Sequence, residues 1–196
     1  KDVFVRDRFT GETLRVSVSS AGEAANGECG DGDITVDGRI VAFESWADNL
    51  VEGDTNDTKD VFVHDRNTGR TTRVSVTSNG EQATSYSSAR AGHVLTPDGR
   101  FAIFESAARN LREYLPYNPG VLIFRHDRQT GETLCMSRNA YGEIANDECL
   151  SPAFSDDGQW IAFDSAAFNL VKGDTTYWWP DVFIHHPGPI RQRPAK

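Results

Sequence analysis

The sequence lacks a long apolar run and any extended basic cluster. Its apolar stretches are short, as at Ile40–Phe43, whereas a membrane-spanning helix needs about 20 consecutive apolar residues. We therefore predict no membrane insertion. Lys and Arg total 20 against 29 Asp and Glu, for a net charge of −9. The chain has no run of basic residues outside the short tail that contains Arg191 and Arg193. Because nucleic-acid binding depends on phosphate neutralisation, we expect no nucleic-acid partner.

Cysteine and catalytic motifs are also scarce. The chain has 3 Cys, and no pair forms a Cys-x-x-Cys or a Cys/His zinc spacing, so a disulfide framework and a zinc site are not indicated. Cys29 and Cys149 occupy equivalent repeat positions and are predicted to be buried thiols. Neither Gly-x-Ser-x-Gly nor His-Glu-x-x-His occurs. These absences predict that the chain is not an enzyme.

What the sequence does contain is one segment repeated four times. It begins with Asp2, Asp60, Leu122 and Asp181, which gives periods of 58, 62 and 59 residues. Other landmarks keep the same phase. They are Asp37-Gly38, Asp98-Gly99 and Asp157-Gly158; Ala42-Phe43-Glu44-Ser45, Ile103-Phe104-Glu105-Ser106 and Ala162-Phe163-Asp164-Ser165; and Thr10-Gly11, Thr68-Gly69 and Thr130-Gly131.

Each unit is predicted to form four short strands. The Asp-Gly pairs stand between apolar residues and predict a two-residue type I′ turn, with positive φ at both central positions. The strand before this turn is predicted at 33–36, 93–96 and 153–155. Gly69 predicts a second hairpin, in which it supplies a left-handed residue. Since no helical period extends over twelve residues, we predict an all-β chain.

Four-stranded units at a constant period indicate a β-propeller, whose blades stack around an axis, rather than a β-sandwich. The units run over about 2–59, 60–121 and 122–180, each a blade repeat of ~60 residues. A strand copy at 181–186 and a Pro/Arg-rich tail at 187–196 follow. In order along the chain, the predicted strands are C-D, A-B-C-D, A-B-C-D and A-B-C.

Three strings resemble the repeats of TolB-type, WD-repeat-like β-propellers: SDDGQWIAFDS, TPDGRFAIFES and DVFVHDRNTG. The resemblance covers Asp2 to His186, with a longer period here. It implies a propeller fold, a periplasmic or extracellular location and a bacterial setting. It also implies a non-enzymatic binding or scaffold module for a protein, peptide or glycan. The alternative is an accessory propeller of, or a remnant from, a hydrolase or peptidase.

Three blade equivalents are too few for a propeller ring, which has about four to eight blades. One hypothesis is a homodimer, in which the N-terminal C-D hairpin completes the last blade of a second chain and the two chains form a six-bladed ring. The two copies of strand C then compete for one place. The other hypothesis is that the sequence is cut from a longer polypeptide with more repeats.

A loop of alternating oxygen ligands is the strongest metal candidate. Asp54, Asn56, Thr58 and Asp60 could converge on Ca²⁺, which takes six to eight oxygens. The unit-two loop has lost this pattern. The alternative is that Asp54 and Asn56 bond to backbone amides of their own turn.

The ligand-binding candidates are residues that the repeat does not explain. Tyr177, Trp178 and Trp179 interrupt a loop, and exposed aromatic rings can stack on sugars or peptides. Asp33 and His93 are the titratable groups of the predicted A strands. His64, His126 and His185 recur at one position in each C strand and are predicted to bond to neighbouring strands.

Overall fold

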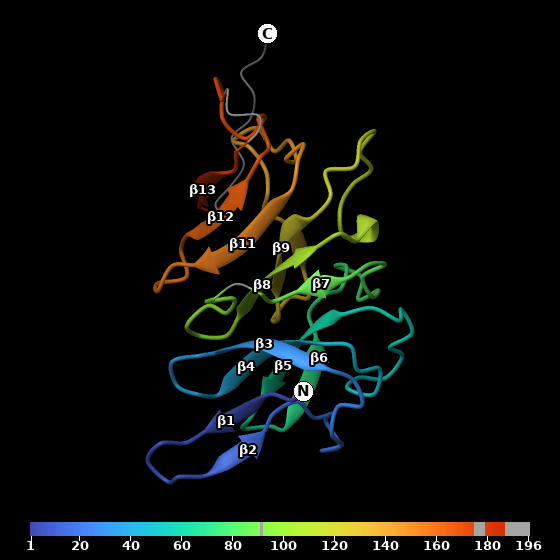
Figure 1. Ribbon diagram of the computed structural model, residues 1–196, viewed down its shortest axis with the longest axis vertical. Helices are drawn as coiled ribbons and strands as arrows, with labels where there is room; N and C mark the ends of the chain where they lie inside the picture. Colours follow the sequence, from blue (N-terminus) through green and yellow to red (C-terminus); the bar gives the residue numbers. More distant parts are fainter. Residues whose placement is uncertain (91, 175–178, 187–196) are drawn as a thin grey trace.

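The computed structural model describes residues 1–90, 92–174 and 179–186, and within them the chain forms antiparallel sheets that follow one another along the long axis of the molecule (Figure 1). A single 3₁₀ turn, η1 (Arg109–Leu111), is the only helical element of this described part. The strands are β1 (Phe4–Arg6), β2 (Thr13–Arg15), β3 (Cys29–Ile34), β4 (Ile40–Ser45), β5 (Asp60–Asp65), β6 (Arg70–Arg73), β7 (Ser87–Ser88), β8 (Phe101–Ser106), β9 (Leu122–Asp127), β10 (Thr133–Cys135), β11 (Cys149–Phe154), β12 (Ile161–Ser165) and β13 (Asp181–His185).

The strand order within the sheets confirms the predicted all-β class and the A-B-C-D unit. The sheets are β1-β2, β3-β4-β5-β6, β7-β8-β9-β10 and β11-β12-β13. The first sheet is thus a C-D hairpin and the last has A, B and C strands. In Figure 1 the β1-β2 hairpin lies at one end of the molecule and β11-β13 at the other. No helix of the described residues is long and apolar enough to cross a membrane.

The Asp-Gly turns differ from the prediction of type I′. Gly38 has φ +70°, but Asp37 does not share a positive φ. The Thr35 amide instead donates to the Ile40 carbonyl across a four-residue connection. The Asp37 carboxylate accepts from Thr35 Oγ1 at 2.6 Å and from the Arg39 amide at 3.0 Å. The pair therefore marks a side-chain-braced turn in which only the glycine needs the left-handed conformation.

The A strands β3, β7 and β11 also differ from the predicted spans. β3 and β11 begin at Cys29 and Cys149, earlier than the apolar pattern indicates. In the middle sheet β7 is only Ser87–Ser88, and His93 has a φ of +58° instead of strand geometry. Pairing with the following strand decides these limits, since the apolar pattern alone cannot place a bulge. Cys29 and Cys149 are buried and free, which confirms the prediction of isolated thiols.

A phenylalanine pair joins the B and C strands of each larger sheet. The ring centroids of Phe43 and Phe62 are 5.9 Å apart at 26°, and the same stack recurs twice. The others are Phe104–Phe124 and Phe163–Phe183. Every residue of β4 and β5 is buried, because side chains on both faces meet a neighbouring sheet. Burial of one phenylalanine contributes roughly 1.5–3 kcal/mol.

Hydrogen bonds repeat between consecutive sheets. The amide of the first A-strand residue donates to a carbonyl just before the preceding C strand: Cys29 to Lys1 at 2.8 Å, Ser87 to Lys59 at 2.7 Å and Cys149 to Val121 at 2.9 Å. These bonds set one register for every junction.

The predicted histidine contacts are confirmed for two C strands. His64 Nδ1 lies 2.9 Å from Thr71 Oγ1, and Thr71 Oγ1 donates to the Val18 carbonyl of the preceding unit. His126 and Thr133 repeat the pair. Burial lowers the pKa of His64 and of His126. At neutral pH each ring is therefore uncharged, and it contacts a threonine whose hydroxyl bonds to the preceding sheet.

Glu44 and Glu105 occupy the same B-strand position but differ in their environment. Glu44 Oε1 lies 2.7 Å from Lys59 Nζ, and Glu44 Oε2 accepts from Ser88 Oγ at 2.6 Å. Burial opposes ionisation of Glu44, but these bonds outweigh it and lower its pKa. The position of Lys59 is Val121 in the next unit.

Glu105 accepts from the Ser151 amide at 2.6 Å, and burial raises its pKa. Arg90 and Asp164 act on that pKa in opposite directions. Ionisation of the two equivalent carboxylates therefore contributes to stability with opposite sign.

We expect Glu44→Gln and Glu105→Gln to show opposite pH dependences of the free energy of unfolding. The low pKa of Glu44 stabilises the fold above its unfolded-state pKa, so E44Q should lose roughly 2 kcal/mol at pH 7 and less near pH 3. The raised pKa of Glu105 makes wild-type stability fall as pH rises through that pKa, so E105Q should gain on wild type between pH 4 and pH 7. Urea unfolding across this pH range measures both. Parallel profiles for the two variants would contradict the assignment.

Candidate ligand-binding site

The antiparallel connectivity divides the connections between two ends of the sheets. The turns 7–12, 35–39, 66–69, 95–100, 128–132 and 155–160 lie at one end, here named the turn face. The segments 16–28, 46–59, 74–86, 107–121, 136–148 and the described parts of 166–180 lie at the other, the loop face. Figure 1 shows the turns of β1-β2 and β3-β4 on the left and longer loops on the right. Because each loop enters or leaves a fixed strand, the loop face gathers residues far apart in sequence.

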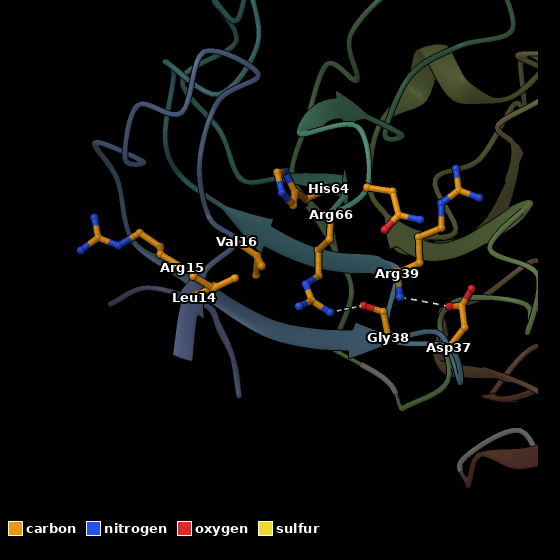
Figure 2. A pocket seen from close by; sticks show the side chains of 9 residues that line it. Leu14, Arg15, Val16, Asp37, Gly38, Arg39, His64 and Arg66 are labelled. Carbon is orange, nitrogen blue, oxygen red and sulfur yellow. Dashed lines mark hydrogen bonds between the residues drawn. The ribbon is translucent and has the colours of Figure 1, made fainter. Parts of the chain in front are cut away.

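Two grooves lie at equivalent junctions on the side of the turn face. The first, of about 270 Å³, lies between β2 and the turns that follow β3 and β5 (Figure 2). The second, of about 400 Å³, is one unit further along the chain. Arginines line both: Arg15, Arg39 and Arg66 in the first, and Arg70, Arg73 and Arg128 in the second.

Most of these charges already have partners within the protein. Arg39 Nη2 lies 2.7 Å from Asp65 Oδ2, and this pairing lowers the pKa of Asp65. Arg66 Nη1 donates to the Gly38 carbonyl, as the dashed line in Figure 2 shows. Arg100 and Asp127 repeat the ion pair at 2.7 Å. The grooves therefore use most of their cations to join turns, and their volumes lie just below or near the lower end of the range of ligand pockets, about 300–1,000 Å³.

Exposed aromatic side chains gather on the loop face instead. Trp46 directly follows β4 and is 55% exposed, and Trp179 precedes β13 and is 77% exposed. Tyr86 directly precedes β7. The loop-face set among the described residues is Trp46, Tyr86, Tyr114, Tyr117, Tyr141, Phe168 and Trp179. The turn face has Phe9 and Trp160. Rings on several loops can together contact one ligand.

The structure separates the predicted ligand-binding residues. Trp179 lies on the loop face, whereas Tyr177 and Trp178 lie outside the described residues. Asp33 Oδ2 accepts from the Leu95 amide of the next unit at 3.0 Å. The His93 carbonyl accepts from the Phe154 amide at 2.9 Å. Asp33 and His93 therefore take part in contacts between consecutive units, away from the loop that carries Trp179.

The predicted metal loop contains an arginine between its carboxylates. Arg73 Nη1 lies 2.8 Å from Asp54 Oδ1 and 3.1 Å from Asp60 Oδ2, and all three side chains are buried. Asn56 Nδ2 donates to Asp60 Oδ2 at 2.9 Å. Thr58 is half-buried in the same loop. Burial raises the pKa of Asp54, and Arg73 opposes this effect. The described residues contain no cluster of three or more His, Cys, Asp or Glu suited to a metal.

Sequence reasoning missed Arg73, although the repeat contains the signal for it. The charged pair Asp60 and Arg73 becomes Leu122 and Cys135 in the next unit, where the loop also has no aspartate. The first unit keeps the pair as Asp2 and Arg15, 3.8 Å apart. Loss of both charges together indicates that the aspartate and the arginine are partners.

Comparison with known proteins adds evidence on the fold. No family model and no curated protein matches the chain. Among solved structures, TolB from Acinetobacter baumannii is 18% identical with a TM-score of 0.50, and the match covers 94% of this chain and 35% of that protein. A protein described as a candidate TolB from Agrobacterium tumefaciens is 16% identical with a TM-score of 0.52, over 90% of this chain and 47% of that one.

A third similar structure comes from work on two prolyl endopeptidases. It is 18% identical with a TM-score of 0.56, and the match covers 97% of this chain and 25% of that protein. The chain therefore has a TolB-like propeller fold and spans less than half the length of these three structures. At this identity the likeness concerns the fold alone.

We expect Arg73→Ala to lower the free energy of unfolding by about 3–5 kcal/mol, because it leaves two buried carboxylates without their cation. The matched control is the triple variant Asp54→Asn, Asp60→Leu, Arg73→Cys, which removes all three charges and gives positions 60 and 73 the residues of the next unit, Leu122 and Cys135. It should recover most of the loss, as measured by urea unfolding. A triple variant no more stable than R73A would show that the charge triad does not account for the loss.

Binding of Ca²⁺ at the Asp54 loop can be tested separately, through the melting temperature. Asn56 Oδ1 is buried without a hydrogen-bond partner among the described residues, which would suit a cation, but the Arg73 guanidinium already lies between the two carboxylates. We therefore expect the same Tm with EDTA and with millimolar Ca²⁺. A Tm that rises with Ca²⁺ in wild type, and not in Asp54→Asn, would instead support a calcium site.

Proposed function

We propose that the chain is a non-enzymatic binding module whose loop face holds a protein, peptide or glycan ligand on exposed aromatic rings. The observation that carries this proposal is that seven exposed aromatic residues lie on the loop face among the described residues, against two on the turn face. Rings on rigid scaffolds give large contact areas at low entropic cost, and they are enriched at binding sites.

The scaffold does not need three of these rings, Trp46, Tyr86 and Trp179, as the sister units indicate. Trp46 stands where the other units have Ala107 and Ala166. Tyr86 stands where the other units have Glu28 and Glu148. Trp179 stands where they have Thr58 and Gly120. Since alanine, glutamate, threonine or glycine serves the same backbone position, packing does not account for the aromatic side chains. Binding residues on loops above a constant scaffold are a common arrangement.

The histidines support a non-enzymatic role. His64 and His126 are buried, and each ring is held by a threonine at a junction between sheets. A catalytic base needs access to a substrate proton. The fold-level likeness to a prolyl endopeptidase keeps one alternative, an accessory propeller of a peptidase. For the module itself we infer a periplasmic or extracellular location, on the resemblance of its repeats to TolB-type propellers.

We expect labelled wild-type protein to bind members of a printed glycan array or a peptide array, and the variant Trp46→Ala, Tyr86→Ala, Trp179→Ala to lose that binding. Because central aromatic contacts dominate binding energy, Kd for the best array member should rise roughly tenfold or more. The triple variant should keep the wild-type unfolding midpoint.

The matched control is Phe9→Ala, which removes a ring that is 99% exposed at the opposite, turn face. It should bind as wild type does. An equal loss of binding in F9A, or no binding by wild type on either array, would contradict a loop-face site. Peptide cleavage by the purified chain would contradict the non-enzymatic role.

A further inference from the structure

The edge of β1 that faces away from β2 has no paired strand among the described residues. In the two complete sheets the equivalent edges of β5 and β9 pair with β4 and β8 over their full length. A groove of about 470 Å³ runs beside this open edge, between Val3–Arg6 and Gly30–Ile34. The groove therefore lies where the repeat places a B strand.

Phe4 indicates which kind of strand would fill the groove. Its equivalents Phe62, Phe124 and Phe183 each stack on a B-strand phenylalanine at 5.8–5.9 Å. Phe4 is 53% exposed and contacts the Arg15 guanidinium instead. A B strand with phenylalanine at its centre would complete the stack.

The charge of Lys1 gives a second indication of which strand would fill the groove. Lys1 corresponds to Lys59, whose Nζ binds the B-strand carboxylate Glu44 at 2.7 Å. Lys1 Nζ lies over Gly30, and no salt-bridge partner of Lys1 occurs among the described residues. The missing strand should therefore carry an acidic residue directly after its phenylalanine. β12 has this pattern, with Phe163 followed by Asp164.

The sheet that contains β12 is incomplete at the opposite end of the molecule. β13 occupies the C position, but Val182 and Ile184 are 76% and 71% exposed. The equivalent Val61 and Val63 of β5 are fully buried against the next sheet. β13 would give up its ladder with β12 and the Phe183–Phe163 stack, contacts that another C strand with a phenylalanine at the same position can form again.

We propose that two copies of this chain share a blade, in which β11-β12 of one copy pairs with β1-β2 of the other and β1 takes the place of β13. This arrangement gives the A-B-C-D order of the complete sheets and joins Phe4 to Phe163 and Lys1 to Asp164. Each copy then contributes two complete sheets and two half blades. A two-fold pair closes into six blades, within the range of about four to eight for propellers.

The register of the internal pairs defines a crosslinking test. Ala42 pairs with Val63 in the β4-β5 ladder, so Ala162 of one copy should face Val5 of the other. Cross-strand neighbours have Cα atoms about 4.5–5.5 Å apart, within disulfide range. The variant Val5→Cys, Ala162→Cys should form a covalent dimer under mild oxidation on a non-reducing gel, and neither single variant should do so at equal yield.

The matched control is Ala162→Cys, Ile184→Cys, which joins β12 to β13 within one chain, where these residues pair. A shared blade predicts a low yield of this internal disulfide. Complete internal crosslinking, with no dimer from V5C/A162C, would overturn the proposal. It would leave the groove to another strand, such as one from a longer polypeptide.

A measurement without cysteines keeps the test independent of disulfide geometry. Light scattering of the wild-type chain should give twice the mass of 21.7 kDa. Asp164→Lys should shift the mass toward one chain, because it faces Lys1, and Lys1→Glu in the same chain should restore the dimer. A wild-type monomer, or a D164K shift that Lys1→Glu fails to reverse, would overturn the proposal.

Discussion

The central strands of the complete sheets are buried on both faces, so these sheets depend for their stability on a neighbour on either side. Every side chain of β4 and β5 is buried, and one continuous cluster runs from Ile40 through Phe104 to Phe163. A repeat that cannot bury its own surface gains stability only by stacking. Phe4 and Val182 are the equivalents of the buried Phe62 and Val61, and they are exposed at the two ends of the stack, where no neighbouring sheet covers them among the described residues.

Polar groups give that apolar stack its register. One backbone hydrogen bond from Cys29, Ser87 or Cys149 recurs at each junction, and the histidine–threonine pairs repeat alongside it. Apolar contact alone is non-directional, so these bonds specify how far one sheet slides over the next. Polar contacts differ between units where both partners are replaced together. One example is the ion pair of Asp60 and Arg73, which is Leu122 and Cys135 in the next unit.

A division of labour follows from this construction. The strands and the turn face use their charges internally, as Arg39 with Asp65 and Arg100 with Asp127. The loop face has exposed rings that vary between units, such as Trp46 beside the alanines of its sister positions. The proposed binding surface therefore lies on the loops, which differ from unit to unit, and not on the strands, which repeat.

Much of the fold could be predicted from repetition in the sequence, because in-phase Asp-Gly, Ile-Ala-Phe and Asp-Val-Phe segments require one supersecondary unit. The order of strands and the buried free thiols follow from that unit. The candidate site was harder to predict from the sequence. The oxygen-rich loop at Asp54 predicted a Ca²⁺ ion, and the structure places the Arg73 guanidinium beside Asp54.

The sequence by itself determined the strand order, the unit length and the apolar faces, since these depend on local alternation and turn chemistry. Only the tertiary structure decided where β3 and β7 begin, that Asp33 bonds to the next unit, and that Trp46 and Trp179 lie on one face. Those features depend on contacts between residues well separated in sequence, from the pairing of Cys29 with Ser45 to the hydrogen bond between Asp33 and Leu95, and local pattern does not specify such contacts.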